Sequence, residues 1–275
     1  MRILRVALYS LLGGLSLTTV AFGNRNFGWD WLAGIVLSAS FVPVALFGPR
    51  RALSQFGVVA PVLLIVTVLT LWSEALIFVQ APEVQQHAVR DLVGASVIYL
   101  IVATVLAVLA VILKLPRMDG PKVELHSAGK AALLVVVCGA AYVLYYLVFG
   151  SITYRFFTKG YYPDAPQFVA RLGLWFWIIQ IGRGVLMTLA VLPVIRTLRM
   201  SRVQAAFAVG VIMWVAGGAA PLLLPNPLMG ATQRIIFTVE ILMENASLGI
   251  TAVLLLRAKQ ARSAAEVSVA ASAHS

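Results

Sequence analysis

One arginine lies in the middle of an apolar stretch that is long enough to cross a lipid bilayer. The stretch runs from Phe168 to Ile195, and Arg183 sits near its midpoint with a glycine on each side. Gln180 precedes it by one helical turn. An arginine at such a depth costs about 2.5–3.5 kcal/mol on insertion scales. Arg183 is therefore expected to face protein or water and to have an acidic partner.

The last apolar stretch of the chain offers that partner. Glu240 and Glu244 are four residues apart, which places them on one face of a helix, and Asn245 follows directly. Counted at 1.5 Å per residue from the start of each span, Glu244 lies nearest to the level of Arg183. The sequence therefore predicts an Arg183–Glu244 pair, with Glu240 as second choice. Glu74 and Tyr146 are expected at the edge of the same cluster.

Two interpretations of this cluster remain open from the sequence. Charged groups inside a membrane commonly mark a substrate or proton pathway, and buried carboxylates can carry protons because burial favours their neutral form. A structural ion pair that fixes the packing of two helices would use the same residue types. The candidates for a substrate or proton site are the following: Arg183, Gln180, Glu240, Glu244, Asn245 and Glu74.

Several other chemistries receive no support from the sequence. The three histidines all lie outside the apolar stretches, so neither a haem nor a metal site is expected, and Arg183 would oppose a cation bound by the glutamates. No nucleotide-binding, metalloprotease or serine-hydrolase motif occurs. We therefore expect no cofactor, no metal and no assigned catalytic residue. A single cysteine excludes an intramolecular disulfide.

Composition indicates the elements that must position these side chains. Of the 275 residues, 61% are hydrophobic and only 11% are charged, and the mean hydropathy is +0.96. A soluble domain averages about 25% charged residues, so the chain is predicted to be an all-α, polytopic transmembrane bundle with the lipid bilayer as its surroundings. The expected spans are eight in number: 6–22, 31–47, 58–79, 92–115, 131–150, 168–195, 203–224 and 233–256.

The distribution of basic residues predicts the orientation of these spans. With eight spans, fourteen Lys and Arg residues fall in the segments on the side of the N-terminus. Four fall on the other side: Arg25, Arg90, Arg155 and Lys159. Basic residues favour the cytoplasmic side, so both termini are expected there. A signal peptide at the first span would invert every later loop and is not expected. The formal net charge of +11 is explained by topology, with no nucleic-acid partner.

The polar segments suggest a division of the chain. Residues 1–115 form a first half of four spans, and 131–257 form a second half that contains the polar cluster. The most polar internal stretch, 116–130, is predicted to be a cytoplasmic hinge between them. Residues 258–275 are rich in Ala and Ser and are expected to be a disordered cytoplasmic tail.

Three motifs in the second half carry a resemblance to known sequences. They are Gln180-Ile181-Gly182-Arg183-Gly184, Pro225-Asn226-Pro227-Leu228-Met229, and Glu240 with Glu244-Asn245. The region 131–256 resembles uncharacterised bacterial multi-pass inner-membrane proteins that have an Arg-Gly span, a Pro-Asn-x-Leu-Met loop and an acidic last span. This resemblance implies the bacterial inner membrane and no known activity.

A fainter resemblance points to the exosortase and archaeosortase transpeptidases, which have about eight spans and a catalytic cysteine followed by two basic residues. Cys138, Arg183 and Arg234 occur in that order. Cys138 lacks the family's Cys-Ser-Gly context, and its apolar neighbours favour a packed core cysteine.

The sequence thus leaves three functions open. A small transporter or permease with a small-molecule substrate is favoured. The alternatives are an enzyme that acts on a lipid or an anchored peptide, and a subunit of a membrane complex. The oligomeric state is not indicated.

Overall fold

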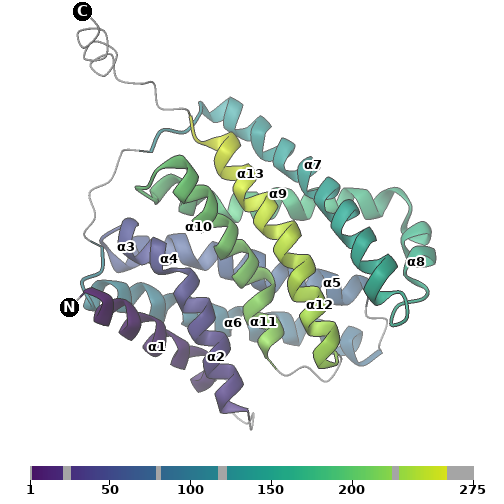
Figure 1. The fold of residues 1–275 in the computed structure, drawn as a ribbon, viewed down its shortest axis with the longest axis horizontal. Coiled ribbons are helices and arrows are strands. Elements are labelled where there is room, and N and C mark those ends of the chain that lie inside the picture. The colour runs from purple at the N-terminus through teal and green to yellow at the C-terminus, as the bar shows by residue number, and fades with distance from the viewer. Residues whose placement is uncertain (1, 21–25, 79–81, 117–122, 225–228, 259–275) are drawn as a thin grey trace, which may run out of the picture.

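The structure is a computed structural model that describes residues 2–20, 26–78, 82–116, 123–224 and 229–258. Within these residues the chain is almost entirely helical (Figure 1). Seven helical segments are long and apolar enough to cross a membrane. The predicted all-α membrane bundle is therefore confirmed at this level. The count of eight spans and the cytoplasmic placement of both termini stay predictions.

The first half of the chain contains a helical hairpin and two longer spans. Helix α1 (Arg2–Val20) packs along α2 (Phe27–Ser40), which α3 (Val42–Phe47) continues. The next span consists of α4 (Ala52–Pro61), η1 (Val62–Leu69) and α5 (Thr70–Phe78). The span α6 (Pro82–Ile112) then packs against α1, α4 and η1.

The second half contains four long helical spans, one of which lies at the centre. It begins with α7 (Ala128–Thr153), η2 (Tyr154–Thr158), α8 (Ala165–Leu172) and α9 (Leu174–Thr197). The central span follows as α10 (Arg202–Trp214), η3 (Val215–Ala219) and α11 (Ala220–Leu223). The last is α12 (Ala231–Ile241), η4 (Leu242–Ala246) and α13 (Ser247–Leu256).

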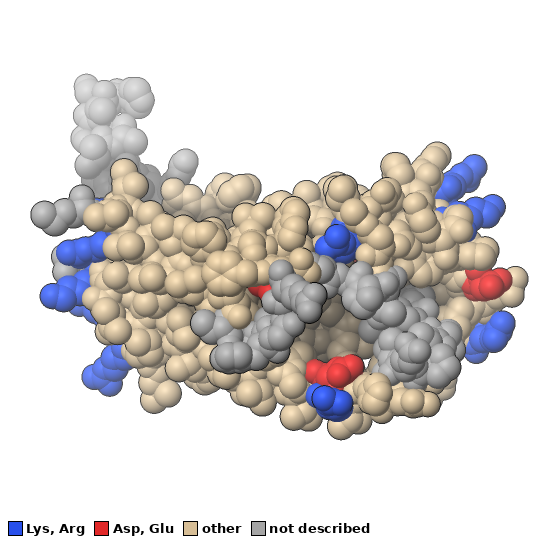
Figure 2. Space-filling model, turned by 90° about the horizontal axis from the view of Figure 1, so that it is seen from below, with Lys and Arg blue, Asp and Glu red and all other residues tan. Residues whose placement is uncertain are grey.

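Helices of the two halves share one apolar core. Helix α2 packs against η3 and α11, while α4 and η1 pack against α9. The span Arg202–Leu223 is the most enclosed, because 67% of its apolar 18-residue stretch is buried. The corresponding share for Ala128–Thr158, at the edge, is 22%. In Figure 1, α1 begins at the left edge of the bundle and α13 ends at its upper left. In Figure 2, Lys and Arg gather at both ends of the long axis, and most of the surface between them is uncharged.

Two expected boundaries were wrong. The sixth span does not begin at Phe168, because Gly173 has φ of 54° and separates α8 from α9. Only glycine adopts this conformation readily, so the helix breaks there. Asp30, which directly precedes the expected second span, lies in the first turn of α2 and is buried. A helix N-terminus favours a carboxylate at that position.

Other expectations fall partly outside the described residues. The central part of the predicted hinge (117–122), the Pro225-Asn226-Pro227 loop and the predicted tail from residue 259 onward are not described. Beside the hinge, Leu125 forms a short antiparallel bridge with Arg257. This bridge joins the segment before α7 to the end of α13.

A buried arginine closes the same end of the bundle. The Arg257 guanidinium donates hydrogen bonds to the carbonyl oxygens of Ile195, Leu198 and Met200 at 2.6–3.1 Å. These carbonyls lie at the C-terminal end of α9, where a positive charge complements the helix dipole. Burial lowers the pKa of Arg257 to about 10, so the side chain remains charged at neutral pH.

Candidate functional site

The polar cluster centres on Arg183 in the middle of α9. Its Nη1 forms an ion pair with Glu74 Oε1 of α5 and donates a hydrogen bond to Gln180 Oε1 at 2.9 Å. The guanidinium carbon also lies 5.7 Å from the ring centroid of Tyr142 on α7. The side chains of Arg183 and Glu74 are 11% and 27% exposed. Three helices therefore hold this arginine: α5, α7 and α9.

The prediction that Arg183 pairs with Glu244, or with Glu240 as second choice, was wrong. Arg183 pairs with Glu74, which the sequence analysis placed only at the edge of the cluster. The reason is the arrangement of the helices around α9. Helix α9 packs against η1 of the span that carries Glu74 and against α13 of the span that carries Glu244, but η4, which holds Glu244 itself, packs against α7 and α10. The depth count favoured Glu244 but could not say which glutamate side chain faces α9.

A row of side chains on α7 lies between the arginine and the second acidic pair. Tyr142, Tyr146 and Gly150 are spaced four residues apart and therefore share one face of the helix. The rings of Tyr142 and Tyr146 have centroids 6.2 Å apart, and Tyr146 lies 5.8 Å from Phe176 of α9. This row leads from Arg183, at Tyr142, to the glutamates, at Gly150.

Glycines allow α7 and α9 to approach closely at this row. A methyl group on Gly184 would lie 2.6 Å from Tyr142 Cβ and 2.9 Å from Gly139 Cα. Real Cβ atoms do not come so close, so Gly184 is required for the contact that brings Tyr142 to Arg183. Gly182, on the other side of Arg183, would meet no atom within 4 Å.

Glu240 and Glu244 converge on the backbone of α7 at Gly150. A Cβ atom there would lie 3.3 Å from Glu240 Oε1 and 3.7 Å from Glu244 Oε1. Glu244 is only 4% exposed. Among the described residues, neither Glu244 Oε1 nor Glu240 Oε2 has a hydrogen-bond partner. The two carboxylates thus form a second polar group, distinct from the Arg183–Glu74 pair.

Asn245 faces a different side of the same helix. Its Nδ2 donates to the carbonyl oxygen of Met213 at 3.4 Å and packs against Gly217 of η3. Asn245 therefore ties η4 to the central span, while Glu244 faces α7. Of the six candidates, the structure brings Arg183, Gln180 and Glu74 together, and Glu240 and Glu244 together, and it places Asn245 behind them.

Three π-helical segments surround the cluster. The segment η1 follows Pro61, which lacks a backbone N–H, η3 contains Gly217 and Gly218, and η4 contains Glu244 and Asn245. η3 packs against both η1 and η4. Such segments are rare in proteins and occur frequently at functional sites, because they interrupt the regular hydrogen-bond ladder.

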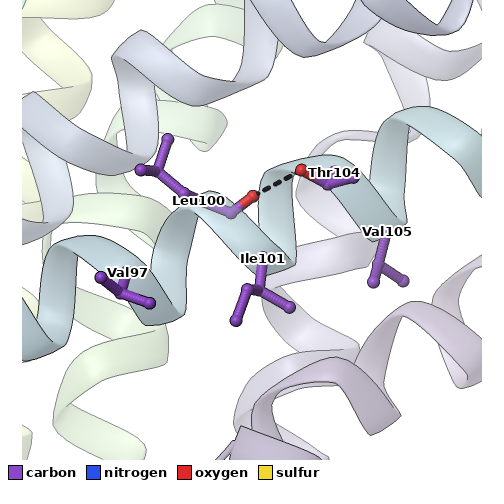
Figure 3. A pocket seen from close by; sticks show the side chains of 5 residues that line it. All are labelled: Val97, Leu100, Ile101, Thr104 and Val105. Atoms are coloured by element: carbon purple, nitrogen blue, oxygen red, sulfur yellow. Dashed lines mark hydrogen bonds between the residues drawn. The ribbon is translucent and has the colours of Figure 1, made fainter.

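A shallow hollow of about 280 Å³ lies elsewhere, along α6 (Figure 3). All five lining residues come from this one helix: Val97, Leu100, Ile101, Thr104 and Val105. The Thr104 hydroxyl donates to its own helix, at the Leu100 carbonyl oxygen. The hollow therefore presents no free polar group that could orient a ligand, and it is not a candidate site.

Cys138 does not lie in an exposed catalytic arrangement. It is fully buried on α7, beside Gly139, where α7 meets α9. Arg234 donates to the carbonyl oxygens of Leu222 and Leu224 at 3.5 and 2.9 Å, so it caps the end of α11. Within the described residues, no group of three or more His, Cys, Asp or Glu side chains is arranged to hold a metal ion.

Tyr142 and Gly150 were not predicted as site residues from the sequence. Their signal was the four-residue spacing Tyr142, Tyr146, Gly150 on one predicted span, which would have marked the face of α7 turned to the cluster.

Comparison with known proteins assigns neither a family nor a function to this chain. The chain matches no protein-family model, and neither the curated proteins nor the solved structures contain a significant match. The function is therefore inferred from the geometry of the cluster.

Proposed function

We propose that this chain is a small transporter or permease of the bacterial inner membrane, and that the Arg183–Glu74–Gln180 group and the Glu240–Glu244 pair form its substrate and proton site. The proposal includes eight spans with both termini in the cytoplasm, and a cluster in the outer half of the bilayer. The charge distribution along the sequence supports this orientation.

The observation that carries the proposal is the set of buried polar atoms without partners. Buried polar groups in proteins are nearly always hydrogen-bonded, and each exception needs an explanation. Among the described residues, Gln180 Nε2, Glu240 Oε2 and Glu244 Oε1 all lack a partner, and Gln180 is completely buried. Asp30, Arg202 and Arg234 also have one such atom each, but the cluster brings together both donor and acceptor atoms that a polar ligand could bond.

The backbone around the cluster supports a site that changes shape. Transport requires that a bound substrate become accessible from each side in turn, so the helices at the site must move. The segments η1, η3 and η4 have interrupted α-helical hydrogen bonding at this level of the bundle. Gly217 and Gly218 followed by Pro221 add a position where the central span can bend.

A ligand screen tests the proposal. The purified protein is heated in detergent with a panel of amino acids, carboxylic acids and organic amines, and each compound that stabilises it is tested for uptake in proteoliposomes. We expect a stabilising compound whose effect is lost in Gln180→Met and kept in Arg171→Met. Arg171 is a suitable control because it is exposed on α8, away from the buried cluster.

The outcomes separate a binding site from a structural network. Stabilisation and uptake that both depend on Gln180 would support the proposal. A compound that acts equally on both variants binds elsewhere and would contradict the assignment of the site. A folded protein that takes up none of the panel compounds would contradict transport of these substrate classes.

A further inference from the structure

We propose that Glu240 and Glu244 form a proton-binding carboxylate pair, separate from the Arg183–Glu74 ion pair, which supplies the coupling proton of the transporter. The coupling role depends on the proposed function. The proton site itself does not, since it can be measured without a substrate.

The charges around the pair are the first argument. Arg183 is neutralised by Glu74, so this cation is already engaged. The other titratable groups that face the cluster are Tyr142 and Tyr146 of α7, which are neutral at ordinary pH. The packed segment η3 consists of Val, Ala and Gly only. The cluster therefore contains three carboxylates and one cation, so it has an excess of negative charge when all three are ionised.

The position of the pair is the second argument. Both carboxylates approach Gly150, and Glu244 is almost completely buried with one oxygen unpartnered. Two buried carboxylates in close proximity repel each other, and binding a proton removes one of the charges. Such a pair takes up and releases protons in two coupled steps.

The small number of oxygen ligands at the pair is the third argument, because it favours a proton over a metal ion. In proteins Ca²⁺ takes six to eight oxygen ligands, and Mg²⁺ takes six, of which several can be water. Here two carboxylates meet, and the described residues bring no third acidic, His or Cys side chain into a metal-binding arrangement with them.

Infrared difference spectroscopy in lipid measures the protons directly. The protein is titrated from acid to alkaline pH, and the carboxylic-acid carbonyl band is recorded. We expect a band that disappears in two steps. In Glu240→Gln and Glu244→Gln one step is lost, because each variant removes one carboxyl group. Asp164→Asn serves as the control, because it removes an exposed carboxyl group outside the cluster, and it should keep both steps.

Gly150→Ala provides a second variant that removes no carboxyl group. Its methyl group would lie 3.3 Å and 3.7 Å from the two glutamate oxygens. An apolar group next to a carboxylate disfavours the charged form, so both steps should move to higher pH. Gly182→Ala, whose methyl group meets no atom within 4 Å, should leave the titration unchanged.

The outcomes of the titration distinguish a proton-binding pair from other kinds of site. Two steps that depend on Glu240 and Glu244 and move with Gly150→Ala support the proposal. Bands that are unchanged in both glutamine variants would overturn it. Bands that respond to sodium at constant pH would overturn it in favour of a sodium site. Failure of the substrate screen with an intact two-step titration would contradict the transport function but not the proton site.

Discussion

The pairing of Arg183 with Glu74 makes a prediction about which of the two residues is harder to remove. In Glu74→Leu the arginine loses its counter-charge and cannot release its own charge. In Arg183→Met the glutamate loses its partner but can bind a proton. Glu74→Leu should therefore destabilise the protein more than Arg183→Met, although it removes the more exposed of the two side chains.

The size of the effect follows from the exposure of the pair. Removing one partner of a buried ion pair typically costs about 3–5 kcal/mol. Both side chains are incompletely buried in the protein, with 11% and 27% exposed, so a value near the lower end is expected. We predict a loss of about 3 kcal/mol in the free energy of unfolding for Glu74→Leu. The hydrogen bond to Gln180 and the contact with Tyr142 remain and limit the loss.

The assay is the free energy of unfolding in lipid bicelles at several pH values, for both single variants and the double variant. Arg171→Met, on the exposed surface of α8, is the control and should change little. A coupling energy of about 2 kcal/mol between Arg183 and Glu74 is expected from the cycle. A coupling near zero, or a larger loss for Arg183→Met than for Glu74→Leu at neutral pH, would refute the pairing.

Three further predictions follow from the same structure. Gly184→Ala should lose about 1–3 kcal/mol of stability because its methyl group meets Tyr142 and Gly139, while Gly182→Ala should lose none; equal thermal stabilities would argue against this helix contact. Cys138 should resist maleimide labelling in the folded protein, and Cys138→Ala should keep any activity; rapid labelling or complete inactivation at normal protein levels would favour the transpeptidase interpretation. Reporter fusions after residues 120 and 262 should report cytoplasm and fusions within 161–167 the outside; a periplasmic C-terminus would contradict eight spans.

The sequence predicted the helices better than the contacts between them. Apolar length determines where a membrane helix can form, so seven described spans lie close to their expected positions. The intramembrane charges also identified Arg183, Glu74, Glu240 and Glu244 as one neighbourhood, because each is costly unless it faces protein. The partner of Arg183 was not predictable, since hydropathy does not order the spans around one another.

Local backbone features explain the remaining differences. The break at Gly173 has a sequence signal only in hindsight, because most glycines in this chain lie inside regular helices. Burial of Asp30 depends on the approach of α11 to α2, which are nearly two hundred residues apart in the chain. Such long-range contacts leave no periodic pattern in either segment.

The clamp that Arg257 forms on the end of α9 has a consequence for biosynthesis. The carbonyl oxygens of Ile195, Leu198 and Met200 receive their donor from a residue that the ribosome adds about sixty positions later. The bridge from Leu125 to Arg257 closes at the same moment. The end of α9 and the start of α7 therefore stay incomplete during translation, and a nascent chain stalled before residue 257 should be cleared by quality-control proteases. Arg257 thus completes the end of α9 only after the last helix has been synthesised.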